Sequence, residues 1–112
     1  MHGVVESDHK LDKAGNPAGG TSSGRGFKVK WQRGPMVDPA TGNRLEQNGA
    51  FVQDLVSTVI DRIEFYQHAS LGRFNCDENA HALQHLRHAN AWLDKRTRTR
   101  EAKGIEGTHT PG

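Results

Sequence analysis

The sequence feature that most constrains the fold is an amphipathic repeat over residues 52–66. Its apolar side chains recur at spacings of three and four positions, which is the pattern of a helix with one buried face. These side chains are Val52, Leu55, Val56, Val59, Ile60, Ile63 and Tyr66. The repeat predicts a helix over about residues 48–68, with Asn48 as its N-cap.

A second repeat follows a turn that contains Gly72 and Asn75. It predicts a helix from about residue 76 to residues 103–104, capped by Asn75 or Asp77 at its start and by Gly104 at its end. The buried stripe consists of Ala82, Leu83, Leu86, Ala89, Trp92 and Leu93. Two helices joined by a short loop make an αα-hairpin, which we expect over residues 47–104.

The segments around the hairpin carry weaker patterns. Residues 1–25 include "AGNPAGGTSSGRG", whose small and polar residues are typical of a flexible arm. Phe27, Val29 and Trp31 alternate with polar residues, which predicts one short strand within a β and turn segment over residues 26–46. We expect this strand to pair with the Met36–Val37 region or with another chain. Residues 105–112 are expected to form a tail, so the fold class is mainly α, of the α+β type.

Composition adds limits on the core and on the partners. The chain has 112 residues, of which 33% are hydrophobic, and its mean hydropathy is −0.79. One hairpin of this composition cannot bury both apolar stripes, so we expect a homo-oligomer. The net charge is only +2, which argues against bulk nucleic-acid binding. No apolar run reaches the roughly 20 residues of a membrane span, and no signal peptide is recognisable, so we expect a cytosolic protein.

The first candidate site is a basic cluster near the end of the second helix. Arg96 and Arg100 are four residues apart and share a helical face, with Trp92 four residues before Arg96. Guanidinium groups bind phosphate in bidentate fashion, and aromatic rings stack on bases. The alternative is a solvated helix end whose cations interact with the helix dipole.

Other candidates are weaker. His81, His85 and His88 have a spacing that metal ligands use, but the HExxH arrangement is missing, so we expect a polar surface row and no bound metal or cofactor. Cys76 is more typical of a small buried residue than of a nucleophile.

Two amides and the tail complete the candidates. Asn79 and Asn90 lie on or beside the leucine stripe, where they predict either interhelical hydrogen bonds or contacts to a base or ribose. Thr108 and His109 in "GIEGTHT" offer hydrogen bonds to phosphate or ribose, although a loose tail is the ordinary interpretation.

The segment "DENAHALQHLRHANAWLDKRTRTREAKGIEGTH", residues 77–109, resembles a family pattern, "RENA..L..L..A..WL..RT..R...GVEGTH". This pattern is that of small phage proteins in the Thoeris anti-defence and anti-CBASS helical-hairpin family. "VKWQRGP" and "QNGAFVQDLVSTVIDRIEFYQ" are similar to the strand and first helix of that family, so the resemblance covers about residues 27–110. Asp77 stands where the family often has Arg.

The resemblance implies a non-enzymatic sponge that binds cyclic nucleotide immune signals in the cytoplasm of the infected bacterial host. Its ligands would be cyclic ADP-ribose isomers, cyclic dinucleotides or cyclic trinucleotides, held in pockets between chains of a dimer or hexamer. Arg96 and Arg100 would bind phosphate, and Asn79 with an aromatic ring from Phe65, Tyr66 or Phe74 would contact the nucleotide. Trp92, Thr108 and His109 complete the predicted ligand-binding set. The alternatives are a nucleic-acid-binding hairpin and a metal-dependent phosphodiesterase that uses the histidine row.

Overall fold

The computed structural model describes residues 4–111, which divide into two compact units. The sheet unit contains the residues up to Phe51 together with those from Lys103 onward, and the hairpin unit is Val52–Ala102. The fold class predicted from the sequence, α+β with a long αα-hairpin after a β region, is confirmed.

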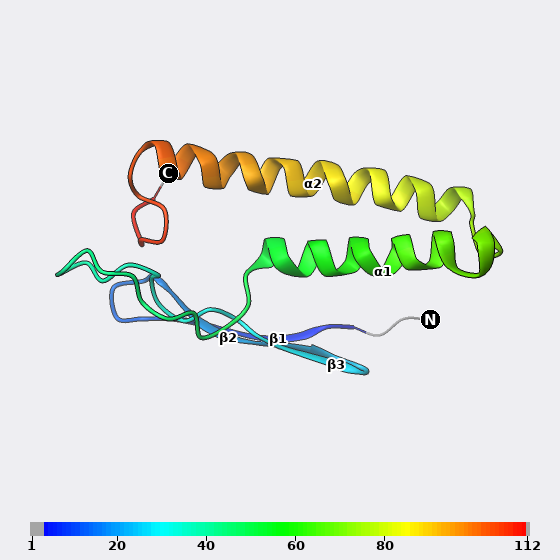
Figure 1. The fold of residues 1–112 in the computed structure, drawn as a ribbon. Helices are drawn as coiled ribbons and strands as arrows, with labels where there is room; N and C mark the ends of the chain where they lie inside the picture. The colour runs from blue at the N-terminus through cyan, green and yellow to red at the C-terminus, as the bar shows by residue number, and fades with distance from the viewer. Residues whose placement is uncertain (1–3, 112) are drawn as a thin grey trace. The chain divides into compact units, whose positions relative to one another are not determined.

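The sheet unit is built on a three-stranded antiparallel sheet (Figure 1). Its strands are β1 (Glu6–Leu11), β2 (Pro17–Gly24) and β3 (Phe27–Lys30), in the order β1-β2-β3. The register pairs Ser7 with Ser22, and Ser22 in turn with Val29. The middle strand is therefore the small-residue segment PAGGTSSG.

The expectation of a flexible arm over residues 1–25 is wrong for the part that forms β1 and β2. Likewise, β3 pairs with β2 and not with the Met36–Val37 region. The error has a physical cause, because β1 and β2 lack the alternation of apolar and polar residues by which strands are recognised. Backbone hydrogen bonds and close approach of small residues hold this sheet together instead.

Gly20 shows why the middle strand needs small residues. It has φ +114°, and a Cβ atom at this position would collide with the backbone carbonyl of Asp8 on β1. Only glycine combines this backbone conformation with so close an approach of two strands. The glycines that suggested a linker are therefore required by strand packing at this point.

Backbone and side-chain hydrogen bonds tie the rest of the sheet unit to the strands. Asn48 accepts from the Arg33 amide at 2.7 Å and donates to the Arg33 carbonyl at 2.8 Å, so it is not the N-cap that we expected. In the C-terminal segment, the Gly107 carbonyl accepts from the amides of Met36 at 2.8 Å and Val37 at 3.1 Å. The predicted tail is thus anchored to the sheet unit.

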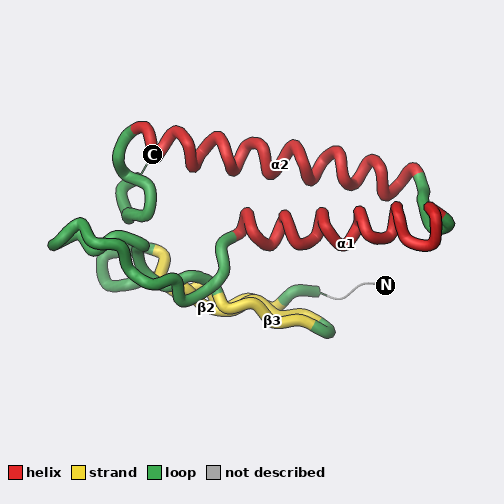
Figure 2. The backbone as a smooth tube through the Cα atoms, in the orientation of Figure 1, coloured by secondary structure: helices red, strands yellow, loops and turns green. Residues whose placement is uncertain are grey.

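The hairpin unit consists of α1 (Val52–Gly72) and α2 (Asp77–Ala102), which run antiparallel to each other (Figure 2). Helix α1 begins four residues later than predicted because Asn48 is engaged with Arg33. Its regular part ends near residue 68, as predicted, since Ala69, Ser70 and Leu71 have non-helical φ/ψ. Helix α2 begins at Asp77, within one residue of the predicted start, and Gly104, with φ +70°, occupies the left-handed position that we expected after its end.

Few side chains are buried between the helices. Leu83 is the one buried apolar side chain within residues 4–111, at 5% exposure. Arg87 pairs with Glu64 across the helices, and the Asn90 amide donates to the Ser57 hydroxyl at 2.9 Å. The interhelical bond predicted for Asn90 is therefore confirmed. Exposed apolar residues of the hairpin unit include Val52, Val59, Phe65, Tyr66, Leu71, Phe74 and Trp92. Neither helix combines the length and the apolar character that a membrane span requires.

Candidate functional site

The hairpin unit has a cavity of about 430 Å³ at the end where the two helices meet. Phe65, Tyr66, Ala69 and Ser70 of α1 form one wall, and Phe74 of the connecting loop with Asn79 of α2 forms the other. We call this the tip cavity. It brings together Asn79 and the three rings of Phe65, Tyr66 and Phe74, one of which was expected from the family resemblance to contact the nucleotide with Asn79.

The aromatic wall is ordered by an arginine. The rings of Phe65 and Tyr66 lie 5.9 Å apart at an interplanar angle of 60°. The Arg62 guanidinium lies 4.9 Å from the centroid of each ring, and its Nε donates to the Tyr66 hydroxyl at 3.3 Å. Cation–π contacts of this kind stabilise a ring orientation by about 0.5–1 kcal/mol at exposed sites. The wall is thus a braced pair of rings whose faces remain half-exposed.

The loop beside this wall is strained. Ser70 and Leu71 adopt left-handed conformations, with φ 52° and 60°. Each such residue costs roughly 1–2 kcal/mol when it carries a Cβ atom. The Leu71 side chain is fully exposed, so it gains no burial that offsets this cost. Strain of this kind is retained at sites where the backbone shape is used.

The predicted phosphate-binding residues lie at the other end of α2. Arg96 is exposed, whereas Arg100 is 4% exposed and is engaged by other groups of the chain. Asn79 and Arg96 are seventeen positions apart on one helix, which separates them by about 25 Å along its axis. A nucleotide cannot reach both within one chain.

Trp92 also lies away from the tip cavity. Its indole is 68% exposed, and the Lys95 ammonium lies 5.0 Å from its ring centroid. Arg98, between the two predicted arginines, pairs with Asp94 at 3.1 Å. This end of α2 therefore presents an exposed ring beside exposed cations.

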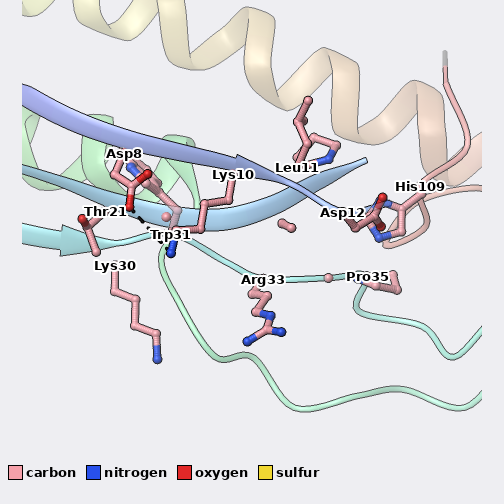
Figure 3. Close-up of a pocket in the computed structure, with 14 residues that line it drawn as sticks. Asp8, Lys10, Leu11, Asp12, Thr21, Lys30, Trp31, Arg33, Pro35 and His109 are labelled. Carbon is pink, nitrogen blue, oxygen red and sulfur yellow. Dashed lines mark ion pairs between the residues drawn. The ribbon is translucent and has the colours of Figure 1, made fainter. Parts of the chain in front are cut away.

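A second cavity, of about 570 Å³, lies in the sheet unit (Figure 3). Its lining includes Lys10, Trp31, Arg33 and Asp12, with His109 from the C-terminal segment close to Asp12. The Lys10 ammonium pairs with Asp8 at 3.7 Å. Hydrogen bonds from the Asn16 and Ala14 amides, with a smaller contribution from the nearby His109, lower the pKa of the Asp12 carboxyl. His109 thus belongs to a different cavity from Asn79.

The remaining candidates have structural partners. The Thr108 hydroxyl donates to the Ile105 carbonyl, and it accepts from the Thr110 amide at 3.1 Å. Cys76 is a half-buried free thiol at the start of α2. Within residues 4–111, no three His, Cys, Asp or Glu side chains come together as a metal site, and this applies to the histidine row on α2.

The sequence was also compared with known proteins. The chain is 39% identical over 87 residues to Thoeris anti-defense 1 of Bacillus phage SBSphiJ7. The chain is a homologue of Thoeris anti-defense 1. The match covers 78% of this chain and 55% of the relative, so the chain spans about half the length of the curated protein it matches. No protein-family model matches the sequence.

Reasoning from sequence missed parts of the cavity of this Thoeris anti-defense 1 homologue. Tyr66 was counted in the buried stripe, although it remained an alternative for the stacking ring. Ala69 and Ser70 were not predicted as cavity residues. They line the cavity because the backbone leaves the helical conformation at Ala69, and no residue type at these positions predicts that change. Arg62 was recognisable only as a cation four residues before Tyr66.

Proposed function

We propose that this protein binds a cyclic nucleotide immune signal of the bacterial host and sequesters it without cleaving it. The signals in question are cyclic ADP-ribose isomers, with cyclic dinucleotides and trinucleotides of CBASS systems as further ligands. The protein would act in the cytoplasm of the infected cell. The identity with a protein named for its action against Thoeris supports this proposal.

The observation that carries the proposal is the composition of the tip cavity. A nucleotide base offers two flat faces and an edge of hydrogen-bonding groups. Phe65, Tyr66 and Phe74 offer rings for the faces, at a stabilisation of about 1–3 kcal/mol per stacked base. Asn79 offers both a donor and an acceptor for the edge. The cavity, at about 430 Å³, has the size of small-ligand sites.

Phosphate binding would come from a second copy of the chain. The roughly 25 Å between Asn79 and Arg96 along α2 is too long for one nucleotide to span. If two hairpins pack antiparallel, the Arg96 end of one lies beside the tip cavity of the other. The exposed apolar side chains of both helices favour such packing. We therefore propose a homo-oligomer, from dimer to hexamer, with sites shared between chains.

Calorimetric titration with cyclic ADP-ribose isomers, cyclic dinucleotides and cyclic trinucleotides tests the proposal. We expect tight binding of at least one ligand, which is recovered chemically intact after the protein is heat-denatured. Recovery of a cleaved product indicates an enzyme, and retention of DNA or RNA alone indicates a nucleic-acid-binding hairpin. Folded protein that binds none of these nucleotides contradicts the proposal.

A matched pair of variants locates the phosphate contact. Arg96→Ala removes an exposed guanidinium, and we expect it to weaken binding by about tenfold or more, since charge-assisted bonds contribute about 1.5–3 kcal/mol. Arg98→Ala removes a neighbouring guanidinium that pairs with Asp94, and we expect little change. Equal effects of the two substitutions would remove Arg96 from the site.

A further inference from the structure

The two walls of the tip cavity are joined by a buried side chain that does not line the cavity. Gln67 lies on α1 between Tyr66 and His68, and it is 6% exposed. Its Oε1 accepts from the Cys76 amide at 3.0 Å, and its Nε2 donates to the Cys76 carbonyl at 3.1 Å. One amide side chain thus satisfies both backbone groups of a residue on the other side of the turn.

The position of Cys76 makes this pair of bonds important for the cavity. Cys76 stands between Phe74 and Asn79, which form the second wall, and α2 begins directly after it. Gln67 follows Phe65 and Tyr66 of the first wall. The clamp between Gln67 and Cys76 therefore connects the two walls directly, within three residues of each wall.

Two further hydrogen bonds, both from Asn75, support the clamp. The Asn75 side-chain Nδ2 donates to the Gln67 carbonyl at 3.5 Å, and the Asn75 backbone N–H donates to the Gly72 carbonyl at 3.0 Å. These bonds surround Ser70 and Leu71, whose left-handed conformations need an external restraint to persist. Gln67 is the one buried residue of α1, and its bonds to Cys76 and Asn75 close the turn that contains Ser70 and Leu71.

We infer that Gln67 is the positioning residue of the tip cavity, which fixes the separation between the ring wall and the Phe74–Asn79 wall. The inference rests on the proposed function, because it assigns to Gln67 the spacing that admits a flat base. A planar ligand is sensitive to this spacing, since contacts on both faces are lost together when the walls move apart.

Gln67→Met tests the inference because methionine retains the length of the side chain and removes both hydrogen bonds. Gln67→Glu retains the acceptor for the Cys76 amide and removes the donor to its carbonyl. Gln84→Met and Gln84→Glu, at an exposed position of α2, are matched controls. Titration calorimetry with the cyclic nucleotide that the wild type binds measures affinity and the number of sites separately.

We expect Gln67→Met to weaken affinity by about tenfold or more at an unchanged number of sites, with Gln67→Glu between it and the wild type. The Gln84 controls should match the wild type. A merely structural role predicts fewer sites at unchanged affinity, and that result overturns the inference. Unchanged affinity and site number in Gln67→Met overturn it as well.

Amide hydrogen exchange of the free protein separates this inference from the proposed function. Gln67→Met should accelerate exchange of the Cys76 and Asn75 amides, while exchange in the middle of α1 and α2 stays as in the wild type. If the wild type binds no nucleotide, the proposed function fails, and exchange alone decides whether Gln67 holds the walls. Unchanged exchange at Cys76 rejects the clamp.

Discussion

The indole Nε1 of Trp31 donates a 2.7 Å hydrogen bond to the hydroxyl of Ser22, which also lies 2.8 Å from the hydroxyl of Ser7. Ser22 is on the middle strand and is 6% exposed, so one small hydroxyl connects β1, β2 and the residue that follows β3. A sheet with so few apolar side chains depends on bonds of this kind, because each buried polar group that loses its partner destabilises the fold.

Replacement of Ser22 tests this dependence. Ser22→Ala leaves the Trp31 indole N–H without its acceptor, and we expect a loss of about 1–3 kcal/mol in the free energy of unfolding. Urea denaturation followed by tryptophan fluorescence measures the change. Ser23→Ala, at the next position of β2, is the control, and we expect it to lie within about 0.5 kcal/mol of the wild type. Equal losses of unfolding free energy in the two variants would show that the bond between Trp31 and Ser22 does not stabilise the sheet.

The close approach of β1 and β2 at Gly20 gives a second prediction. Gly20→Ala places a Cβ atom against the Asp8 carbonyl, so we expect a loss of stability of about 2 kcal/mol or more. Gly15→Ala is the matched control, because Gly15 also has a positive φ, of 83°, and open space around it. It should cost about 1–2 kcal/mol from backbone strain alone. Urea denaturation of both variants measures which one loses more free energy of unfolding. A larger loss for Gly15→Ala than for Gly20→Ala contradicts the prediction.

The left-handed conformation of Leu71 predicts a gain in stability. Leu71→Gly relieves a strain of roughly 1–2 kcal/mol and adds unfolded-state entropy that costs roughly 0.5–1 kcal/mol. We expect thermal unfolding to show a net gain of at most about 1.5 kcal/mol. Leu71→Ala removes the same exposed side chain without relieving the strain, and we expect it to be nearly neutral. A loss of stability in Leu71→Gly relative to Leu71→Ala is the contrary outcome.

Mixing two variants tests whether sites are shared between chains. Asn79→Ala impairs the tip cavity and Arg96→Ala impairs the basic end of α2, so each variant alone should bind nucleotide weakly. After the two are denatured together and refolded at equal amounts, about one quarter of the shared sites combine an intact tip with an intact Arg96. Calorimetry should then recover about that fraction of tight sites.

A site formed within one chain gives the opposite result. In that case no mixture of the two variants contains an intact site, and no tight binding returns. A mixture of Asn79→Ala with itself, taken through the same refolding, controls for changes caused by the procedure.

Sequence reasoning succeeded where a periodic pattern decides the structure. The stripe from Val52 to Tyr66 and the leucines of α2 predicted the hairpin, because apolar spacing follows the helical period directly. For Asn90 the sequence left an interhelical bond and a nucleotide contact open, and its amide donates to Ser57 across the helices. Capping was less predictable, since Asn48 has the right residue type for an N-cap but bonds to Arg33.

Sequence reasoning failed where structure depends on contacts distant in sequence. The segment that forms β1 and β2 was predicted to be a flexible arm. The structural roles of Gly20 and Ser22 depend on contacts with Asp8 on β1 and with Trp31, which the sequence pattern does not show. In the candidate site, the family resemblance pointed to Asn79 and one ring among Phe65, Tyr66 and Phe74, and all four residues line the tip cavity. The hydrogen bonds from Gln67 to Cys76 were missed. A glutamine that stands between Tyr66 and His68 is indistinguishable in sequence from an exposed helix residue.

The bonds from the Gly107 carbonyl to Met36 and Val37 bear on the order of events during synthesis. The hairpin unit, Val52–Ala102, is one continuous segment, while the sheet unit is made of segments that precede and follow it. The residues of both helices therefore leave the ribosome before Gly107, which bonds to Met36 and Val37 of the sheet unit. The sheet unit is completed only when the residues near Gly107 have also left the exit tunnel. A nascent chain arrested before that point would contain both helices in full and a sheet unit that still lacks the bonds from Gly107 to Met36 and Val37.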